Sequence, residues 1–373
     1  VMEHIENLTS KQGGDNEKLI FKVMKRGADL TRAIEAGKQE FADNGLRYDL
    51  TVPLARYYAN NKEKLPTPFK ALQIGNVWRA DNPQKGRFRQ FVQCDIDILG
   101  DATNLAEIEE ILALTKALKR ICPDKAYTVR VNDRAILKGM ADYSGFPENE
   151  TDKVFIILDK MDKIGLDGVR EELLAEGYAP EAVEKYTGLL AEIQNDAAGV
   201  RALGEKLSGV MDPAKAENLA TIMETVKAVA DIEFGLEFDP TLVRGMGYYT
   251  GPIFEVTLDG YNFAIAGGGR YDQMIGKFSG QNVSACGFSI GFERIVTILK
   301  DHEQGSFKLP EGSVAYLIGS KAPTARKAEV LAQAAEARKT GVVATVLPMS
   351  KNMKHQIELL EAEGFTKFEK IYE

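Results

Sequence analysis

The chain has 373 residues, of which 44% are hydrophobic and 27% charged, and its formal net charge is −8. This composition is typical of a globular protein, and the length allows two or three domains. The acidic balance excludes a general basic coat for nucleic acid and predicts no DNA partner, although RNA binding through local basic patches stays open. No apolar run reaches about 18 residues, so we expect no membrane partner.

The cysteines and histidines give no sign of a metal centre or a hydrolase. The cysteines are far apart and lack Cys-x-x-Cys spacing, which predicts neither a zinc site nor a disulfide framework and fits a reducing, cytoplasmic location. The histidines lie near the ends or in expected linkers, away from any nucleophile motif, so a catalytic triad is not expected. These residues are Cys94, Cys122, Cys286, His4, His302 and His355.

The N-terminal region predicts short elements and one marked junction. Residues 1–25 contain a Gly-Gly break and an apolar run from Leu19 to Val23, which indicates a short helix, a loop and a strand. Residues 46–53 read as a strand followed by a helix, because Thr51 is a good N-cap residue and Pro53 suits the first turn.

The most informative stretch is a predicted antiparallel hairpin. Two runs, 71–79 and 87–99, alternate in the period-2 pattern of strands, and residues 81–86 supply turn chemistry between them. One face of the second run carries Arg87, Arg89, Phe91, Gln93, Asp95 and Asp97.

That face does not suit a protein core, because buried charges need partners or a ligand. At about 3.3 Å per residue, the stretch from Phe91 to Asp97 spans roughly 20 Å, enough for a nucleotide at one end and a small cationic group at the other. Arg79 and Arg89 would bind phosphates, and Phe91 would stack on a base. The alternative is a solvated face of an edge hairpin.

The middle of the chain predicts a helical module inside a sheet domain. A helix is expected over 104–120 and a strand over 127–131. From 150 to 232 the composition shifts to Glu, Lys, Ala and Leu at helical spacing, with no candidate site residues. We therefore expect a helical insertion that interrupts the sheet.

Three glycine-rich stretches follow. Residues 238–251 combine glycines with Arg244, Tyr248 and Tyr249, which could be a plain turn or a site, and a strand is expected over 253–258. Residues 264–272 read as a strand ending in a triple glycine, which alone is a weak phosphate signal. Residues 285–294 read as strand, glycine and helix, and Arg294 in the first helical turn suggests a bound anion.

The C-terminal region predicts a separate small domain. Residues 301–312 read as a linker, and 313–373 alternate strand and helix in the order β-α-β-α-β, which implies a parallel sheet.

Several motifs together resemble one family. Trp78-Arg79-Ala80-Asp81 with the run from Arg87 to Phe91 resembles the second motif of class II aminoacyl-tRNA synthetases, and residues 285–294 match the third. Residues 93–97 and 244–249 resemble the histidyl-tRNA synthetase versions, although many members have Asp where this chain has Gly247.

The resemblance implies an α+β fold in four parts. Residues 1–300 would form a class II antiparallel sheet flanked by helices, interrupted by the 150–232 insertion that approaches the tRNA acceptor arm. The 301–312 linker and an anticodon-binding-type domain at 313–373 would follow. The family's first motif, which builds a dimer interface, is absent, and the last domain stops short, so we expect missing segments at both ends.

The resemblance also assigns site residues. Arg244 and Arg79 would be catalytic. Histidine would be bound by Asp49, Thr51, Arg79, Gln93, Asp97, Arg244, Tyr248 and Tyr249. ATP would be bound by Arg79, Arg87, Phe91 and Arg294, and the tRNA acceptor end would meet Gln84 and Lys85.

The implied activity is ATP-dependent ligation of histidine to tRNA(His) by a homodimer, with Mg²⁺ accompanying ATP and no protein-bound metal. The alternatives are non-catalytic relatives: the synthetase-like regulatory subunit of ATP phosphoribosyltransferase, or a tRNA-sensing domain. Such relatives typically lose the histidine-specific motif, and a regulatory subunit would not need the anticodon-type domain. Both features are present here.

Overall fold

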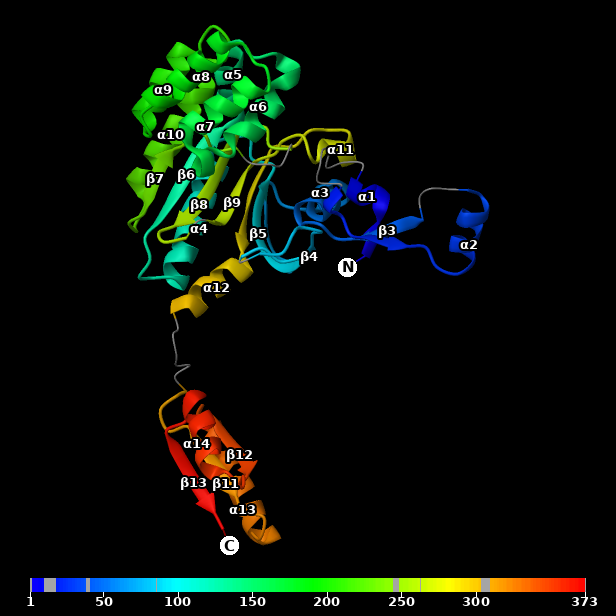
Figure 1. Ribbon diagram of the computed structural model, residues 1–373, viewed down its shortest axis with the longest axis vertical. Coiled ribbons are helices and arrows are strands. Elements are labelled where there is room, and N and C mark those ends of the chain that lie inside the picture. The colour runs from blue at the N-terminus through cyan, green and yellow to red at the C-terminus, as the bar shows by residue number, and fades with distance from the viewer. Residues whose placement is uncertain are drawn as a thin grey trace. The chain divides into compact units, whose positions relative to one another are not determined.

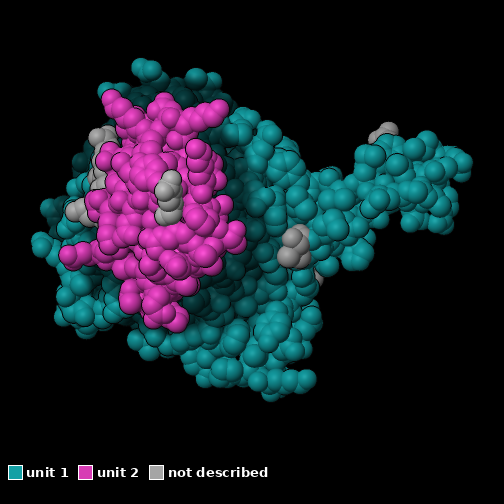
Figure 2. All heavy atoms as spheres, turned by 90° about the horizontal axis from the view of Figure 1, so that it is seen from below, with its two compact units in different colours: residues 1–295 teal, residues 296–373 magenta. Residues whose placement is uncertain are grey.

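The structure is a computed structural model that describes residues 2–9, 18–37, 41–84, 86–243, 248–261, 263–302 and 309–372. It divides into two compact units, residues 1–295 and 296–373, which Figure 2 colours separately. Arg244 and Lys85, two of the predicted site residues, lie outside the described residues. None of the helices in the described ranges has the length and apolar character needed to cross a membrane.

A seven-stranded sheet organises the first unit (Figure 1). Every neighbouring pair is antiparallel except β6 and β7, which run parallel. In spatial order the strands are β4 (Phe69–Trp78), β5 (Gln90–Leu99), β10 (Ala285–Gly291), β9 (Ala264–Arg270), β8 (Pro252–Leu258), β6 (Tyr127–Asp133) and β7 (Gly235–Phe238). The mostly antiparallel sheet and its flanking helices confirm the expected α+β class.

The predicted hairpin is β4 and β5, but its second strand starts later than expected. Arg87 pairs with Gln84 in an isolated bridge, with backbone N–H to O distances of 3.1 and 2.9 Å, so the loop closes before β5 begins at Gln90. Arg87 and Arg89 therefore precede the strand. One face of the edge strand β4 is exposed to solvent, and its side chains Leu72 and Ile74 are each 66% accessible.

Residue 51 is not the N-cap that the sequence predicts. Helix α3 spans Thr51–Asn61 and Leu50 occupies the cap position, without a side-chain hydrogen bond. Asp49 instead satisfies a first-turn donor, because its Oδ1 accepts from Val52 N at 3.2 Å. The junction thereby fixes the Asp49 carboxylate at the start of the helix.

Helix α4 (Leu105–Ile121) contacts strand β10 with a buried apolar stripe that includes Ile108, Ile111 and Leu114. Glu107 lies in the same buried face and forms a bidentate pair with Arg270, at 2.6 and 2.7 Å.

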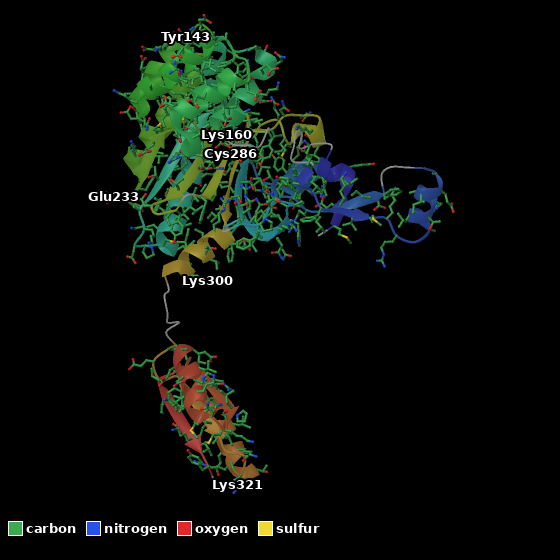
Figure 3. The ribbon with its side chains drawn as sticks, viewed as in Figure 1. Tyr143, Lys160, Glu233, Cys286, Lys300 and Lys321 are labelled. Carbon is green, nitrogen blue, oxygen red and sulfur yellow. The ribbon has the colours of Figure 1, made fainter. Side chains whose placement is uncertain are left out.

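The three cysteines are all free. Cys286 is buried in β10 (Figure 3), where burial raises the pKa of its thiol.

The helical module gathers around β6 and β7 (Figure 1). Helix α5 contacts α8, so the helical layer starts before residue 150. Its helices are α5 (Arg134–Ser144), α6 (Thr151–Leu158), α7 (Met161–Ala175), α8 (Pro180–Glu192), α9 (Ala197–Lys206) and α10 (Pro213–Val229).

A small sheet holds the N-terminal segments, in the order β1-β3-β2. The strand expected at Leu19–Val23 is shorter and lies later, as β2 (Lys22–Met24), because Ile20 packs instead into a small core with Leu8 and Tyr48. The other elements of the unit are β1 (Met2–His4), α1 (Ile5–Thr9), α2 (Ala28–Glu35), β3 (Ala42–Leu46), α11 (Gly276–Ser279), and the 3₁₀ turns Lys62–Lys64 and Glu148–Glu150.

The second unit has the predicted β-α-β-α-β order with a parallel sheet, β12-β11-β13. Apolar residues cover both sheet faces, including Val330 on one side and Leu360 on the other. Its elements are β11 (Val314–Ile318), α13 (Thr324–Lys339), β12 (Ala344–Pro348), α14 (Met353–Ala362) and β13 (Lys367–Ile371). Helix α12 (Phe292–His302) follows β10.

Candidate active site

A cavity of about 390 Å³ opens on the seven-stranded sheet, within the first unit. Its floor comes from β5, β9 and β10, and its walls come from the start of α3, the loop before β5 and the tyrosine pair. The predicted residues that line it are Asp49, Thr51, Arg79, Arg87, Phe91, Gln93, Asp97, Tyr248, Tyr249 and Arg294. Gln84 is exposed and does not line it.

Three buried carboxylates gather at one side of this cavity: Asp49, Asp95 and Asp97. Each is only 2% exposed. Burial raises the pKa of Asp49 to about 6 and that of Asp97 to about 7, and it raises the pKa of Asp95 well above its usual range. A cationic ligand would favour the ionised forms, so this end of the cavity is suited to a cation.

Asp97 is held from two sides. The Tyr271 hydroxyl donates to Asp97 Oδ1 at 2.5 Å, and Gln73 also hydrogen-bonds to the carboxylate. Gly287 on the adjacent strand makes room, because a Cβ there would lie 2.1 Å from Asp97 Oδ1. Both hydrogen bonds lower the pKa of Asp97, partly offsetting burial.

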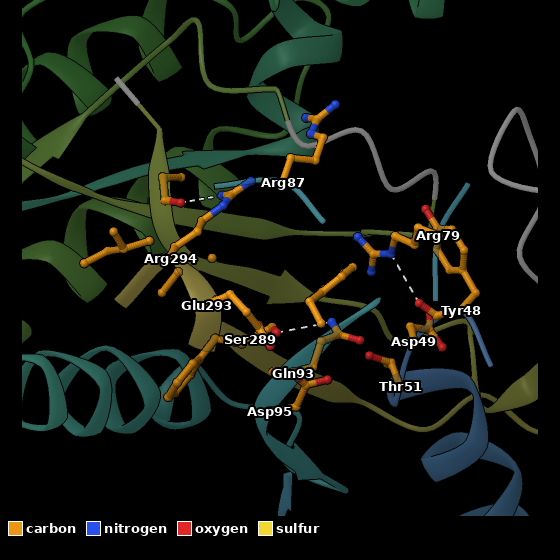
Figure 4. Close-up of a pocket in the computed structure, with 18 of the residues that line it drawn as sticks. Tyr48, Asp49, Thr51, Arg79, Arg87, Gln93, Asp95, Ser289, Glu293 and Arg294 are labelled. Carbon is orange, nitrogen blue, oxygen red and sulfur yellow. Dashed lines mark hydrogen bonds between the residues drawn. The ribbon is translucent and has the colours of Figure 1, made fainter. Parts of the chain in front are cut away.

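A second hydrogen-bonded chain crosses from β5 to β10. Gln93 Nε2 donates to Ser289 Oγ at 3.2 Å (Figure 4), and the Ser289 side chain hydrogen-bonds to Asp95. The register places Ser289 directly opposite Asp95.

Tyrosines form the neighbouring wall. The rings of Tyr248 and Tyr249 lie 4.8 Å apart between centroids, and Tyr248 lies edge-on to Tyr271 at 6.0 Å. Burial raises the pKa of Tyr248 well above its usual range, so its hydroxyl stays protonated as a neutral group. This wall offers flat apolar surface with hydroxyl groups, which suits a heteroaromatic ring.

Arg79 and Phe91 lie beside the acidic end. The Arg79 guanidinium is 4.4 Å from the Tyr48 ring centroid and 5.1 Å from that of Phe91, and its Nε donates to Tyr48 O at 3.2 Å. The positive charge of Arg79 acts to lower the pKa of Asp49. A cation, a ring and a carboxylate are therefore packed side by side (Figure 4).

Arg294 stands at the other side of the cavity, in the first turn of α12. Its Nε donates to Gly86 O at 3.0 Å and its Nη1 donates to Ala264 O, and the guanidinium lies 5.7 Å from the Phe263 ring centroid. The adjacent Glu293 accepts from Val92 N through both carboxylate oxygens, at 2.9 and 3.0 Å. Helix α12 is thus bonded to β5 at the cavity edge.

The cavity therefore has an acidic side, bordered by the Arg79 guanidinium and the Phe91 ring, and an opposite side that carries the Arg294 guanidinium. Such a site can bind a cationic group and an anionic, base-containing group in one space. Among the described residues, no group of three or more His, Cys, Asp or Glu side chains could hold a metal ion.

The sequence analysis gave no role to several polar residues that line the cavity, among them Asp95, Tyr271, Ser289 and Glu293. The alternating pattern of residues 87–99 placed Asp95 on the same face as Gln93 and Asp97, so the sequence could have indicated its place in the cavity. Ser289 meets Asp95 because of the register between β5 and β10, and Tyr271 reaches the cavity because β9 ends beside β10. Local periodicity in the sequence does not encode the pairing between strands.

The chain is similar to known proteins along nearly its whole length. The family model described as histidyl-tRNA synthetase matches residues 1–295. The histidine–tRNA ligase of Leifsonia xyli subsp. xyli is 43% identical over 378 residues, covering 99% of this chain and 85% of the relative.

Two solved structures share the fold. The histidyl-tRNA synthetase from Nostoc sp. PCC 7120 has a TM-score of 0.73 at 24% identity, over 97% of this chain and 80% of that one. A protein described as an ATP phosphoribosyltransferase regulatory subunit/histidyl-tRNA synthetase from Bacillus halodurans C has a TM-score of 0.72 at 21% identity, over 100% and 88%.

Proposed function

This chain belongs to the histidyl-tRNA synthetase family, and from that premise we propose that it is a histidine–tRNA ligase that activates histidine with ATP and transfers it to tRNA(His). One observation carries the proposal beyond similarity: a single cavity holds buried carboxylates beside an arginine and an aromatic ring. Histidine has a cationic ammonium group and a ring with N–H donors, and ATP has phosphates and a base. The two sides of the cavity match these two substrates.

Histidine occupies the acidic side in this proposal. Asp49, Thr51 and Gln93 receive the ammonium group, because they lie together at the start of α3 and on β5 (Figure 4). Asp97 accepts an N–H from the imidazole, whose ring lies against the tyrosine wall of Tyr248 and Tyr249. A pocket that bonds ring nitrogens rejects analogues lacking them, because buried polar groups would then lose partners.

ATP extends from Arg79 and Phe91, which border the acidic side, to Arg294 at the other side of the cavity. Phe91 stacks on adenine, Arg79 and Arg87 contact phosphates, and Arg294 pairs with the terminal phosphates. Arg79 lies between both substrates and also contacts the histidine carboxylate. This placement agrees with the Arg79–Phe91 stack and with the position of Arg294 at a helix N-terminus, where an anion is favourable.

Magnesium accompanies ATP in this proposal. An ion that accompanies ATP is held mainly by phosphate oxygens and needs only one or two carboxylates from the protein. Asp81 and Glu293, two carboxylates of the cavity lining near the arginines, would hold it. The ion would neutralise phosphate charge.

The chemical step is an attack of the histidine carboxylate on the α-phosphate, with pyrophosphate leaving. The protein contributes positioning and charge stabilisation. Arg79, whose guanidinium lies over the Tyr48 and Phe91 rings, would contact both reacting groups. Arg244 is the second catalytic residue proposed, on the sequence motif alone. The transfer step then joins the activated histidine to the tRNA 3′ end, for which Gln84 and Lys85 in the loop before β5 are the proposed acceptor contacts.

We also propose that the protein is a cytoplasmic homodimer. Leu72 and Ile74, each 66% exposed on β4, provide apolar surface that a partner could cover. Free cysteines fit a reducing compartment. Light scattering at micromolar concentration checks the assembly: a monomer throughout would contradict it.

ATP–pyrophosphate exchange dependent on histidine tests the main proposal. We expect exchange with histidine and none with other amino acids, and charging of tRNA(His) in a second assay. A regulatory subunit or tRNA-sensing relative would bind without exchange. No exchange by folded, dimeric protein would overturn the ligase proposal.

A further inference from the structure

Asp95 lies at the centre of the acidic side of the cavity. It is flanked on β5 by Gln93 and Asp97, and it pairs across the sheet with Gln73 on β4 and Ser289 on β10. It is 2% exposed and lines the cavity (Figure 4). The family match does not assign it a role.

The hydrogen bonds around Asp95 leave one carboxylate oxygen available. Ser289 has a single hydroxyl proton; its oxygen accepts from Gln93 Nε2, so the proton goes to Asp95. Asp95 Oδ1 has no hydrogen-bond partner among the residues that the structure describes. Gln73 is opposite Asp95 on β4, but its side-chain amide hydrogen-bonds to Asp97 and to Leu50 O instead.

Asp95 Oδ1 belongs to a set of buried acceptors on the cavity wall. Within the described ranges, the other lining oxygens without a partner are Asp49 Oδ2, Gln93 Oε1 and Asp97 Oδ2. Buried acceptors without donors are costly, at about 1–3 kcal/mol each and more when charged. A ligand that brings several N–H donors into this space would satisfy them together.

Histidine has the matching donors. Its ammonium group has three N–H bonds and its ring has one, or two when protonated. We propose that Asp95 is a further substrate-contacting residue, whose Oδ1 accepts an N–H from bound histidine so that three carboxylates share a substrate with two basic groups. This inference rests on the proposed function.

The charge balance around Asp95 agrees with that role. Burial, and next the negative charge of Asp97, raise the pKa of Asp95 well above its usual range, and Asp49 acts in the same direction. The positive charge of Arg79 lowers the pKa of Asp95, but this effect is smaller than those that raise it. A bound cation would compensate the excess of carboxylates, which a residue with a purely structural role would not require.

Asp95→Asn keeps the side-chain volume and removes the charge. In histidine-dependent ATP–pyrophosphate exchange we expect KM for histidine to rise at least about tenfold, with kcat within about threefold of wild type, because the contact is present in the ground state. Equilibrium dialysis with histidine alone should show the same loss. Asp152→Asn is the matched control, since that carboxylate is 93% exposed and does not line the cavity.

Ser289→Ala tests the same inference without altering the carboxylate. It removes the donor that orients Asp95, so KM should rise by less than in Asp95→Asn. The two losses should be less than additive in the double variant, which also loses the acceptor for Gln93 Nε2. An unchanged histidine KM in Asp95→Asn, or a loss confined to kcat, would overturn the inference. Wild-type protein that shows no exchange would instead refute the proposed function.

Discussion

The Tyr271 hydroxyl donates to Asp97 Oδ1 at 2.5 Å, linking the end of strand β9 to the last residue of the cavity-lining row on β5. Both residues are 2% exposed. The bond fixes one carboxylate oxygen and leaves Oδ2 without a partner among the described residues. Tyr271 therefore orients the group that we propose accepts the imidazole N–H.

Tyr271→Phe should weaken histidine binding. Losing a hydrogen bond to a charged group removes roughly 1.5–3 kcal/mol, which corresponds to a rise of about 10- to 150-fold in KM for histidine. Pyrophosphate exchange at varied histidine concentration measures it. Tyr127→Phe is the control: it also loses a buried hydroxyl bond, to Thr115 O at 3.0 Å, but Tyr127 does not line the cavity. Equal KM changes in both variants would argue against an orienting role.

Asp97→Asn should stabilise the ligand-free protein at high pH. The pKa of Asp97 is raised to about 7, so the folded protein holds a proton that the unfolded chain releases near its usual 3.8. Unfolding releases that proton between these values, so stability falls as pH rises through this window, and the penalty is full above pH 7. The pKa of Asp49, raised to about 6, adds to the same slope.

Thermal denaturation at two pH values checks this prediction. At pH 8 the variant should have a higher Tm than wild type, while at pH 4 the two should be similar. The variant should also lose the increase in Tm that added histidine gives the wild type. A lower Tm for the variant at pH 8 would mean that the ligand-free protein already stabilises the negative charge of Asp97, which would contradict the prediction.

Periodicity predicted the parts of this site that lie on one strand and missed the parts that lie between strands. Alternation placed Phe91, Gln93 and Asp97 on one face, and the structure has all three lining the cavity. The predicted start of β5 at Arg87 was wrong, because the bridge to Gln84 closes the loop first. Tyr271 reaches Asp97 across 174 residues of chain, a contact that no local pattern encodes.

Gly287→Ala should impair histidine binding through Asp97. An added Cβ would lie 2.1 Å from Asp97 Oδ1 and 3.1 Å from Ile96 O, and the nearer group must shift. We expect KM for histidine to rise, with a smaller effect on KM for ATP. Gly188→Ala is the control, because a Cβ there meets nothing within 4 Å and lies in helix α8, where Ala adds up to about 1 kcal/mol of stability. An unaltered histidine KM in Gly287→Ala would show that the Asp97 carboxylate can move without loss of binding.

Arg270→Met should destabilise the first unit. The Arg270 guanidinium binds Glu107 through two hydrogen bonds and also donates to Asp101 O and Thr103 O, at 3.1 and 2.7 Å. Its loss leaves the fully buried Glu107 without its cation, which costs about 3–5 kcal/mol. Urea denaturation followed by circular dichroism measures the change.

The double variant Arg270→Met, Glu107→Leu is the informative comparison for that ion pair. Removing both charges should recover much of the lost stability, because the penalty comes from the uncompensated carboxylate. Arg201→Met is the surface control, since Arg201 pairs with Glu217 and Glu224 at an exposed site and should have a small effect. If the two substitutions lowered the free energy of unfolding additively, the cost would come from lost packing and not from the uncompensated carboxylate.

Arg294→Ala should raise the requirement for ATP. Arg294 is the third residue of α12, where a cation is unfavourable against the helix dipole, and its bonds to Gly86 O and Ala264 O aim it along the cavity wall. A bound triphosphate would supply the opposing charge, so we expect KM for ATP to rise about tenfold or more with KM for histidine nearly constant. Arg326→Ala is the control: it is also the third residue of a helix, α13, but lies in the second unit, paired with Glu329 at 2.7 Å. Initial rates of pyrophosphate exchange at varied ATP measure both variants. An unchanged ATP dependence in Arg294→Ala would remove this residue from the nucleotide site and leave Arg79 and Arg87 as the phosphate-binding groups.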